Sequence, residues 1–132
     1  MSYENRVYDN EFAYVVLAIR RGSITIDEFI TWIYLMIERH QNLPTYFFDL
    51  SDVKISSDIY QIMRDKFPNI LPDDGLTDKE SEVFWGIAFR RRPDLDEDAI
   101  PITKKTALKR LEQYPHVVER FKKTFPFIKL DF

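Results

Sequence analysis

The sequence predicts a mainly α-helical fold, a single compact domain of five or six helices over residues 1–132 with at most one short extended pair. Several segments repeat apolar residues about every 3.6 positions, the period of an α-helix. These segments begin at capping residues and end at glycine or proline, and no two of them show the sustained alternation of paired strands. A length of 132 residues with 45% hydrophobic and 31% charged residues suits one ordinary domain.

The first predicted helix lies near the start of the chain. Asp9 or Asn10 can cap it, because both side chains accept hydrogen bonds from the free amides of a first helical turn. The helix is expected to end at Arg20-Arg21-Gly22, where cations occupy the last turn and glycine follows.

The second predicted helix begins at a capping box. Thr25 and Glu28 stand three residues apart and can each satisfy a free amide of the other, and the helix continues to about His40. Its apolar stripe includes Ile30 and Ile33, which we expect to be fully buried. This stripe is wide, so we expect the helix to lie at the centre of the domain.

The next segment is harder to assign. Residues 46–48 are aromatic but too few to distinguish an extended segment from a helical turn. Ser56 or Ser57 can cap a third helix that runs to about Phe67, where Pro68 follows.

The last helices again begin at threonine caps. Thr77 and Glu80 repeat the capping-box pattern and open a fourth helix to about Arg91. Thr103 caps a fifth helix. Pro115 either ends that helix or occupies the first position of a sixth.

Motifs of catalysis and metal binding are missing from the sequence. The absence of cysteine excludes thiolate zinc sites and a cysteine nucleophile. His40 and His116 have no partner at metal-binding spacing, and residues 94–105 lack the glycine and glutamate of a calcium loop. Three glycines cannot build a dinucleotide or phosphate-binding loop. We therefore expect no enzymatic activity, no metal and no cofactor.

The chain shows no signal for membrane insertion. Its first residues lack a basic segment followed by an apolar one, and no apolar run approaches the roughly 18 residues of a membrane span. We therefore expect a soluble, cytoplasmic protein without a membrane partner.

Charge is distributed unevenly along the chain. Residues 1–82 carry 15 acidic and 8 basic side chains, a net charge of −7, whereas residues 103–123 carry 7 basic and 2 acidic side chains, a net charge of +5. An acidic front suits a basic protein partner that is chosen electrostatically. The basic segment 103–123 leaves open an alternative function, that of a nucleic-acid-binding regulator.

The predicted fourth helix is apolar on two sides. Trp85 and Phe89 lie four residues apart, nearly opposite the core stripe. The helix is therefore either sandwiched in the core or offers these rings, with Arg92 beside them, as anchors of a protein interface. Acidic residues complete this candidate partner-binding surface: Asp73, Asp74, Asp78 and Glu82.

One stretch resembles a known group of proteins. Between Gly22 and Ser51 it contains Ser23-Ile24, Thr25, Asp27-Glu28, Trp32, Leu43-Pro44 and aromatic residues before Asp49-Leu50-Ser51. This pattern resembles a motif of small uncharacterised bacterial proteins, several of which are encoded beside polymorphic toxins and are similar to their immunity proteins. The resemblance implies a non-enzymatic protein that neutralises a cognate toxin by direct binding. It assigns no functional residue, and the alternative is a structural or self-associating protein.

Overall fold

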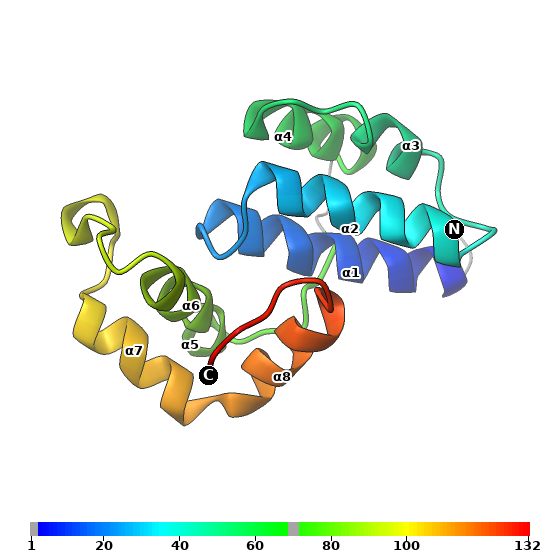
Figure 1. Cartoon of the computed structure of the whole chain (residues 1–132). Helices are drawn as coiled ribbons and strands as arrows, with labels where there is room; N and C mark the ends of the chain where they lie inside the picture. The colour runs from blue at the N-terminus through cyan, green and yellow to red at the C-terminus, as the bar shows by residue number, and fades with distance from the viewer. Residues whose placement is uncertain (1–2, 69–71) are drawn as a thin grey trace. The chain divides into compact units, whose positions relative to one another are not determined.

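The computed structural model describes residues 3–68 and 72–132, with side chains described for residues 8–68 and 72–132. The elements are α1 (Tyr3–Arg20), α2 (Ile26–Arg39), α3 (Tyr46–Leu50), α4 (Ser56–Lys66), α5 (Asp78–Ser81), α6 (Val83–Arg91), the 3-10 helix η1 (Glu97–Ala99), α7 (Lys104–Gln113) and α8 (Pro115–Thr124) (Figure 1). No strand occurs in these ranges, and the prediction of a mainly α-helical fold is confirmed. Crossing a bilayer would need a longer and more apolar helix than any in the described ranges.

The chain forms two compact units. The first consists of Met1–Ile19 and Ile24–Gly75, and the second of Arg20–Ser23 and Leu76–Phe132. Residues 20–23, from the last residue of α1 into the turn, thus belong to the second unit, whereas the rest of α1 and all of α2 belong to the first. That residues 1–132 form one cooperative domain stays a prediction.

Helix α1 begins before its predicted cap. Asp9 lies within the helix, is 4% exposed, and accepts a hydrogen bond of 2.6 Å from the Tyr46 hydroxyl. The prediction that Asp9 or Asn10 caps this helix is therefore wrong, because the Asp9 carboxylate bonds to a ring of α3. Burial, and then the Asp9 carboxylate, raise the pKa of Tyr46, which keeps its hydroxyl in the donating form. Gly22 follows the helix with a φ of 78°, as the predicted end requires.

Helix α2 begins at the predicted capping box. The Thr25 amide donates to Glu28 Oε1 (2.9 Å), and the Glu28 amide donates to Thr25 Oγ1 (3.2 Å). Ile33 is fully buried, but Ile30 is only half-buried, so the prediction for Ile30 is wrong. Trp32 is 1% exposed, so the buried face of α2 lies nearer to Trp32 than to Ile30.

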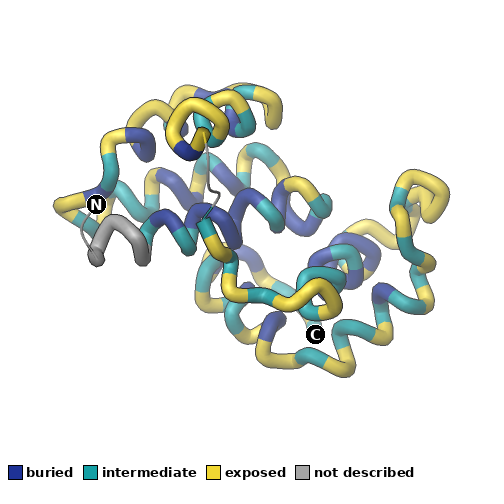
Figure 2. The backbone as a smooth tube through the Cα atoms, turned by 180° about the vertical axis from the view of Figure 1, so that it is seen from behind, coloured by how far each residue is buried: buried dark blue, intermediate teal, exposed yellow. Residues whose placement is uncertain are grey.

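The aromatic run after α2 is a helical turn. Tyr46, Phe47 and Leu50 of α3 are buried at the spacing of one helix face. Neither Ser56 nor Ser57 caps α4: the residue before the helix is Ile55, and the Asp58 carboxylate accepts hydrogen bonds from the amides that precede α4. Within α4 only Ile59 is buried, and this helix accordingly shows mostly exposed and intermediate residues (Figure 2).

The second unit begins with the other predicted capping box. The Thr77 amide donates to Glu80 Oε1 (2.9 Å), and the Glu80 amide donates to Thr77 Oγ1 (3.2 Å). The single helix predicted from here to Arg91 is divided at Glu82 into α5 and α6.

Helices α6 and α7 approach closely at Gly86. A Cβ atom at this position would lie 2.5 Å from the Ala107 carbonyl oxygen and 2.7 Å from Leu111 Cγ. Since real Cβ atoms do not come this close to other heavy atoms, the contact requires a residue without a side chain.

The last two helices follow the sequence prediction. Thr103 Oγ1 accepts a hydrogen bond of 3.2 Å from the Thr106 amide at the start of α7. Pro115 is the first residue of α8, where its missing amide hydrogen has no cost. Beyond α8, Phe125 and Ile128 are buried and anchor the final segment.

Candidate protein-binding site

The two rings of the predicted aromatic pair differ in burial. Phe89 is 1% exposed, so it does not meet the requirement of an exposed interface anchor. Trp85 is half-buried, and the guanidinium carbon of Arg21 lies 3.6 Å from its ring centroid. The structure thus buries Phe89 and leaves Trp85 partly exposed on α6.

Arg92, the third member of the predicted surface, holds the turn that precedes α2. Its Nη2 donates to the Gly22 carbonyl oxygen, and Arg91 Nη1 donates to the Ser23 carbonyl oxygen (2.8 Å). The buried Ser23 hydroxyl in turn donates to the Phe84 carbonyl oxygen (2.6 Å). A partner that contacted Arg92 would have to replace part of this network.

The predicted acidic residues are separated by their local roles. Glu82 accepts a hydrogen bond of 2.6 Å from Arg110 Nε, which neutralises its charge. Asp73 accepts one of 2.8 Å from the Gly75 amide and stabilises the loop before α5. Asp73 and Asp78 are exposed and Asp74 is half-buried, so the described part of this loop offers acidic side chains at the surface.

The basic segment 103–123 is partly neutralised. Arg110 bonds to Glu82, and Lys122 Nζ lies 3.6 Å from Glu119 Oε1. Lys105, Lys109 and Lys123 are exposed. The segment thus keeps exposed lysines, while Arg110 and Lys122 are paired within the chain.

Both histidines bond to neighbouring side chains. His40 Nδ1 lies 3.2 Å from the Tyr8 hydroxyl, and His116 Nε2 pairs with Glu80 Oε2. Within residues 8–68 and 72–132, no three histidine, aspartate or glutamate side chains gather as a metal ion would require.

Glu80 has a perturbed acidity. The hydrogen bond from the Thr77 amide, and next the contact with His116, lower the pKa of Glu80 to about 2. A carboxylate with a lowered pKa stabilises the fold above its unfolded pKa of about 4.3, and this contribution is lost as the pH falls toward 2.

We therefore expect the variant Glu80→Gln to be less stable than the wild type near pH 7 by up to about 1 kcal/mol. This difference should shrink as the pH falls from about 4 toward 2, because the wild-type carboxylate is then protonated. Urea unfolding at a series of pH values measures the difference. His116→Asn should keep part of the pH dependence, since the Thr77 amide still donates to Glu80. A stability difference between the wild type and Glu80→Gln that does not change with pH would contradict the lowered pKa of Glu80.

Exposed apolar side chains occur on the first unit, around α3 and α4. Phe48 is 53% exposed and Ile55 is 60% exposed, large fractions for residues of this size. Three carboxylates, those of Asp49, Asp52 and Asp58, line a hollow of about 290 Å³ at the same place. We call the set Phe48, Asp49, Asp52, Ile55 and Asp58 the α3–α4 surface.

The backbone places each exposed apolar residue beside one of these carboxylates. The amides of Ser51 and Asp52 donate to the carbonyl oxygens of Phe48 and Asp49, both at 3.3 Å, so the helical turn continues through Asp52. Bonds between residues three positions apart form a 3-10 turn, which places Asp49 and Asp52 on one face, and Phe48 directly precedes Asp49 in the sequence. Ile55 adjoins Asp58, whose Oδ2 accepts a hydrogen bond of 3.4 Å from the Ile55 amide.

The hollow combines negative charge with apolar walls. Val53 and Ile62 line it together with the three carboxylates. None of the ion pairs found in the described ranges includes Asp49, Asp52 or Asp58. The α3–α4 surface therefore presents negative charge to any molecule that approaches it.

Sequence reasoning noticed the acidic front but missed the two apolar residues. The signal in the sequence was the spacing Tyr46, Phe47 and Leu50, which places Phe48 on the other side of a helical turn. Ile55 gave no comparable signal, because a lone apolar residue before a helix is usually buried as a staple.

The sequence matches no protein-family model, no curated protein and no solved structure.

Proposed function

We propose that this chain is a non-enzymatic protein-binding module that neutralises a basic partner, such as a cognate toxin domain, by direct binding through its α3–α4 surface. The observation that supports it most is the exposure of Phe48 and Ile55 beside three carboxylates. Protein interfaces combine a few large apolar anchors with a polar rim, and the α3–α4 surface has both parts.

Charge favours a basic partner over an acidic one. The three carboxylates of the hollow would attract lysine or arginine side chains, and such complementarity raises association rates at low salt. Domains that cleave nucleic acid bind phosphates and are basic at their working surface, which suits this arrangement. The resemblance of residues 22–51 to immunity-like proteins agrees with such a role.

The direct test requires that a secreted protein with a variable C-terminal domain is encoded beside this chain, and it takes that domain as the partner. Calorimetry should give a complex that the double variant Phe48→Ala with Ile55→Ala weakens at least about tenfold, since two anchors are removed. Asp49→Asn with Asp52→Asn should mainly slow association and reduce its dependence on salt.

Tyr34→Ala provides the matched control, because Tyr34 is 56% exposed in the same unit but lies on α2. It should leave the affinity unchanged. Equal affinity of the wild type and the Phe48/Ile55 double variant would refute the α3–α4 surface. Self-association of the wild type that the double variant abolishes would instead favour a self-associating protein.

A further inference from the structure

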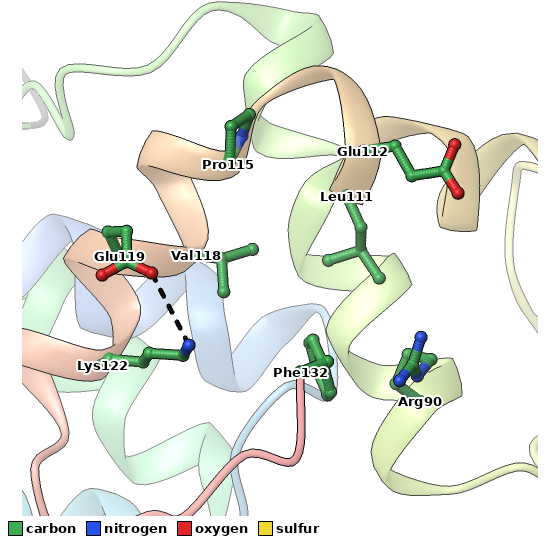
Figure 3. Close-up of a pocket in the computed structure, with 8 residues that line it drawn as sticks. All are labelled: Arg90, Leu111, Glu112, Pro115, Val118, Glu119, Lys122 and Phe132. Atoms are coloured by element: carbon green, nitrogen blue, oxygen red, sulfur yellow. Dashed lines mark ion pairs between the residues drawn. The ribbon is translucent and has the colours of Figure 1, made fainter.

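A second site lies in the other unit, in a groove of about 250 Å³ lined by α7 and α8. Leu111 of α7 and Val118 of α8 lie around one space, with Pro115 and Phe132 at its borders (Figure 3). The groove therefore has an apolar floor that comes from both helices.

Among the charged residues at the margin, Arg90 has its ion-pair partner outside the lining of the groove. Lys122 and Glu119 pair with each other at 3.6 Å, and Glu112 is turned away from the apolar side chains (Figure 3). Arg90 stands at the remaining border. A guanidinium can bind a carboxylate and stack on an aromatic ring, so Arg90 can contact both kinds of group.

Arg90 makes both of these contacts with the last two residues. Its guanidinium carbon lies 4.5 Å from the centroid of the Phe132 ring, and its Nη2 lies 3.9 Å from Asp131 Oδ1. Arg90, at the border of the groove, thus already contacts an acidic residue followed by an aromatic one, and the aromatic residue also lines the groove. This contact shows which chemistry the site accepts.

The hold on these two residues is weak. The side chains of Arg90 and Asp131 are 45% and 89% exposed, and ion pairs this open to water contribute little. Residues 129–132 have no regular secondary structure, and the last buried anchor before them is Ile128. A competing segment could therefore displace Asp131 and Phe132 without unfolding the helices.

We propose that the groove and Arg90 at its border bind a segment of a partner protein in which an acidic residue precedes an aromatic one, and that Asp131 and Phe132 make the contacts with Arg90 until such a segment replaces them. The site is separate from the α3–α4 surface and takes a partner segment of the opposite charge. It is independent of the proposed function.

The test uses a labelled peptide with the sequence of residues 126–132, titrated with the full chain and followed by fluorescence anisotropy. The double variant Asp131→Ala with Phe132→Ala should bind the peptide at least about tenfold more tightly than the wild type, because the internal competitor is gone. Adding Arg90→Gln to that variant should weaken binding at least about fivefold, since the ion pair and the ring contact are both lost.

Lys105→Gln is the matched control, an exposed cation of α7 outside the groove, and should leave peptide affinity unchanged. Equal peptide affinity of the wild type and the double variant, or no effect of Arg90→Gln, would overturn the proposal. If the double variant does not fold, the proposal is tested on the wild-type chain by following the methyl chemical shifts of Leu111 and Val118 as peptide is added. Saturable shifts there at high peptide concentration support the site, and shifts confined to other methyl groups refute it.

Discussion

Replacing Phe89 by alanine is expected to lower the free energy of unfolding by about 3–5 kcal/mol, the range for large aromatic side chains removed from a core. The ring is 1% exposed, so its loss would leave a cavity rather than a bare surface. Trp85→Ala should cost less, because Trp85 is only half-buried and loses mainly its contact with Arg21. An exposed interface pair would instead lose little stability at either position.

The matched control is Phe48→Ala, the same substitution at a ring that is 53% exposed. It should change the free energy of unfolding by no more than about 0.5 kcal/mol, as is usual for surface positions. A loss of less than about 1 kcal/mol for Phe89→Ala would contradict the packing of α6.

The two tryptophans make the measurement specific to each unit. Trp32 lies in the first unit and Trp85 in the second, and the chain has no other tryptophan. Urea unfolding of Trp32→Phe and Trp85→Phe, followed by fluorescence, therefore reports on one unit at a time. Coincident transitions are what one cooperative domain over residues 1–132 requires.

Features set by neighbours in the sequence were predictable. The capping boxes at Thr25 and Thr77 join residues three positions apart, so their geometry needs no knowledge of the fold. Pro115 at the start of α8 and Gly22 after α1 are equally local. These signals were sufficient for a mainly helical fold and for most helix boundaries.

Features set by distant residues were not predictable. Asp9 has the composition of a cap, but its partner is the hydroxyl of Tyr46, 37 residues away. The face that α6 presents to solvent depends on Arg21, which covers Trp85 from a different part of the chain. A helical wheel gives the faces of a helix and leaves open which of them another segment covers.

The α3–α4 surface was predictable from the sequence only in part. Its carboxylates Asp49, Asp52 and Asp58 belong to the acidic front that the sequence shows. Their gathering around one hollow depends on the turn from α3 into α4, which places residues of two helices together. Exposure of Phe48 follows only once α3 is known to be a helix.

The close approach of α6 and α7 makes Gly86→Ala a sensitive test of the second unit. Alanine in place of glycine within an exposed helix normally stabilises it by about 1 kcal/mol. Here we expect the free energy of unfolding to fall by about 2–3 kcal/mol, the upper part of the range for overpacked cores. The reason is that the new Cβ would lie 2.5 Å from the Ala107 carbonyl oxygen, a backbone atom that cannot rotate away.

The double variant Gly86→Ala with Leu111→Ala separates the two obstacles to this Cβ atom. Truncation of Leu111 removes the contact at 2.7 Å, but the Ala107 carbonyl oxygen remains in place. Adding Gly86→Ala to Leu111→Ala should therefore still destabilise the protein by at least about 1 kcal/mol, measured by urea unfolding through Trp85 fluorescence. A gain in stability in that background would assign the whole effect to the Leu111 side chain. If Gly86→Ala alone raised the free energy of unfolding, α6 and α7 would not meet at Gly86.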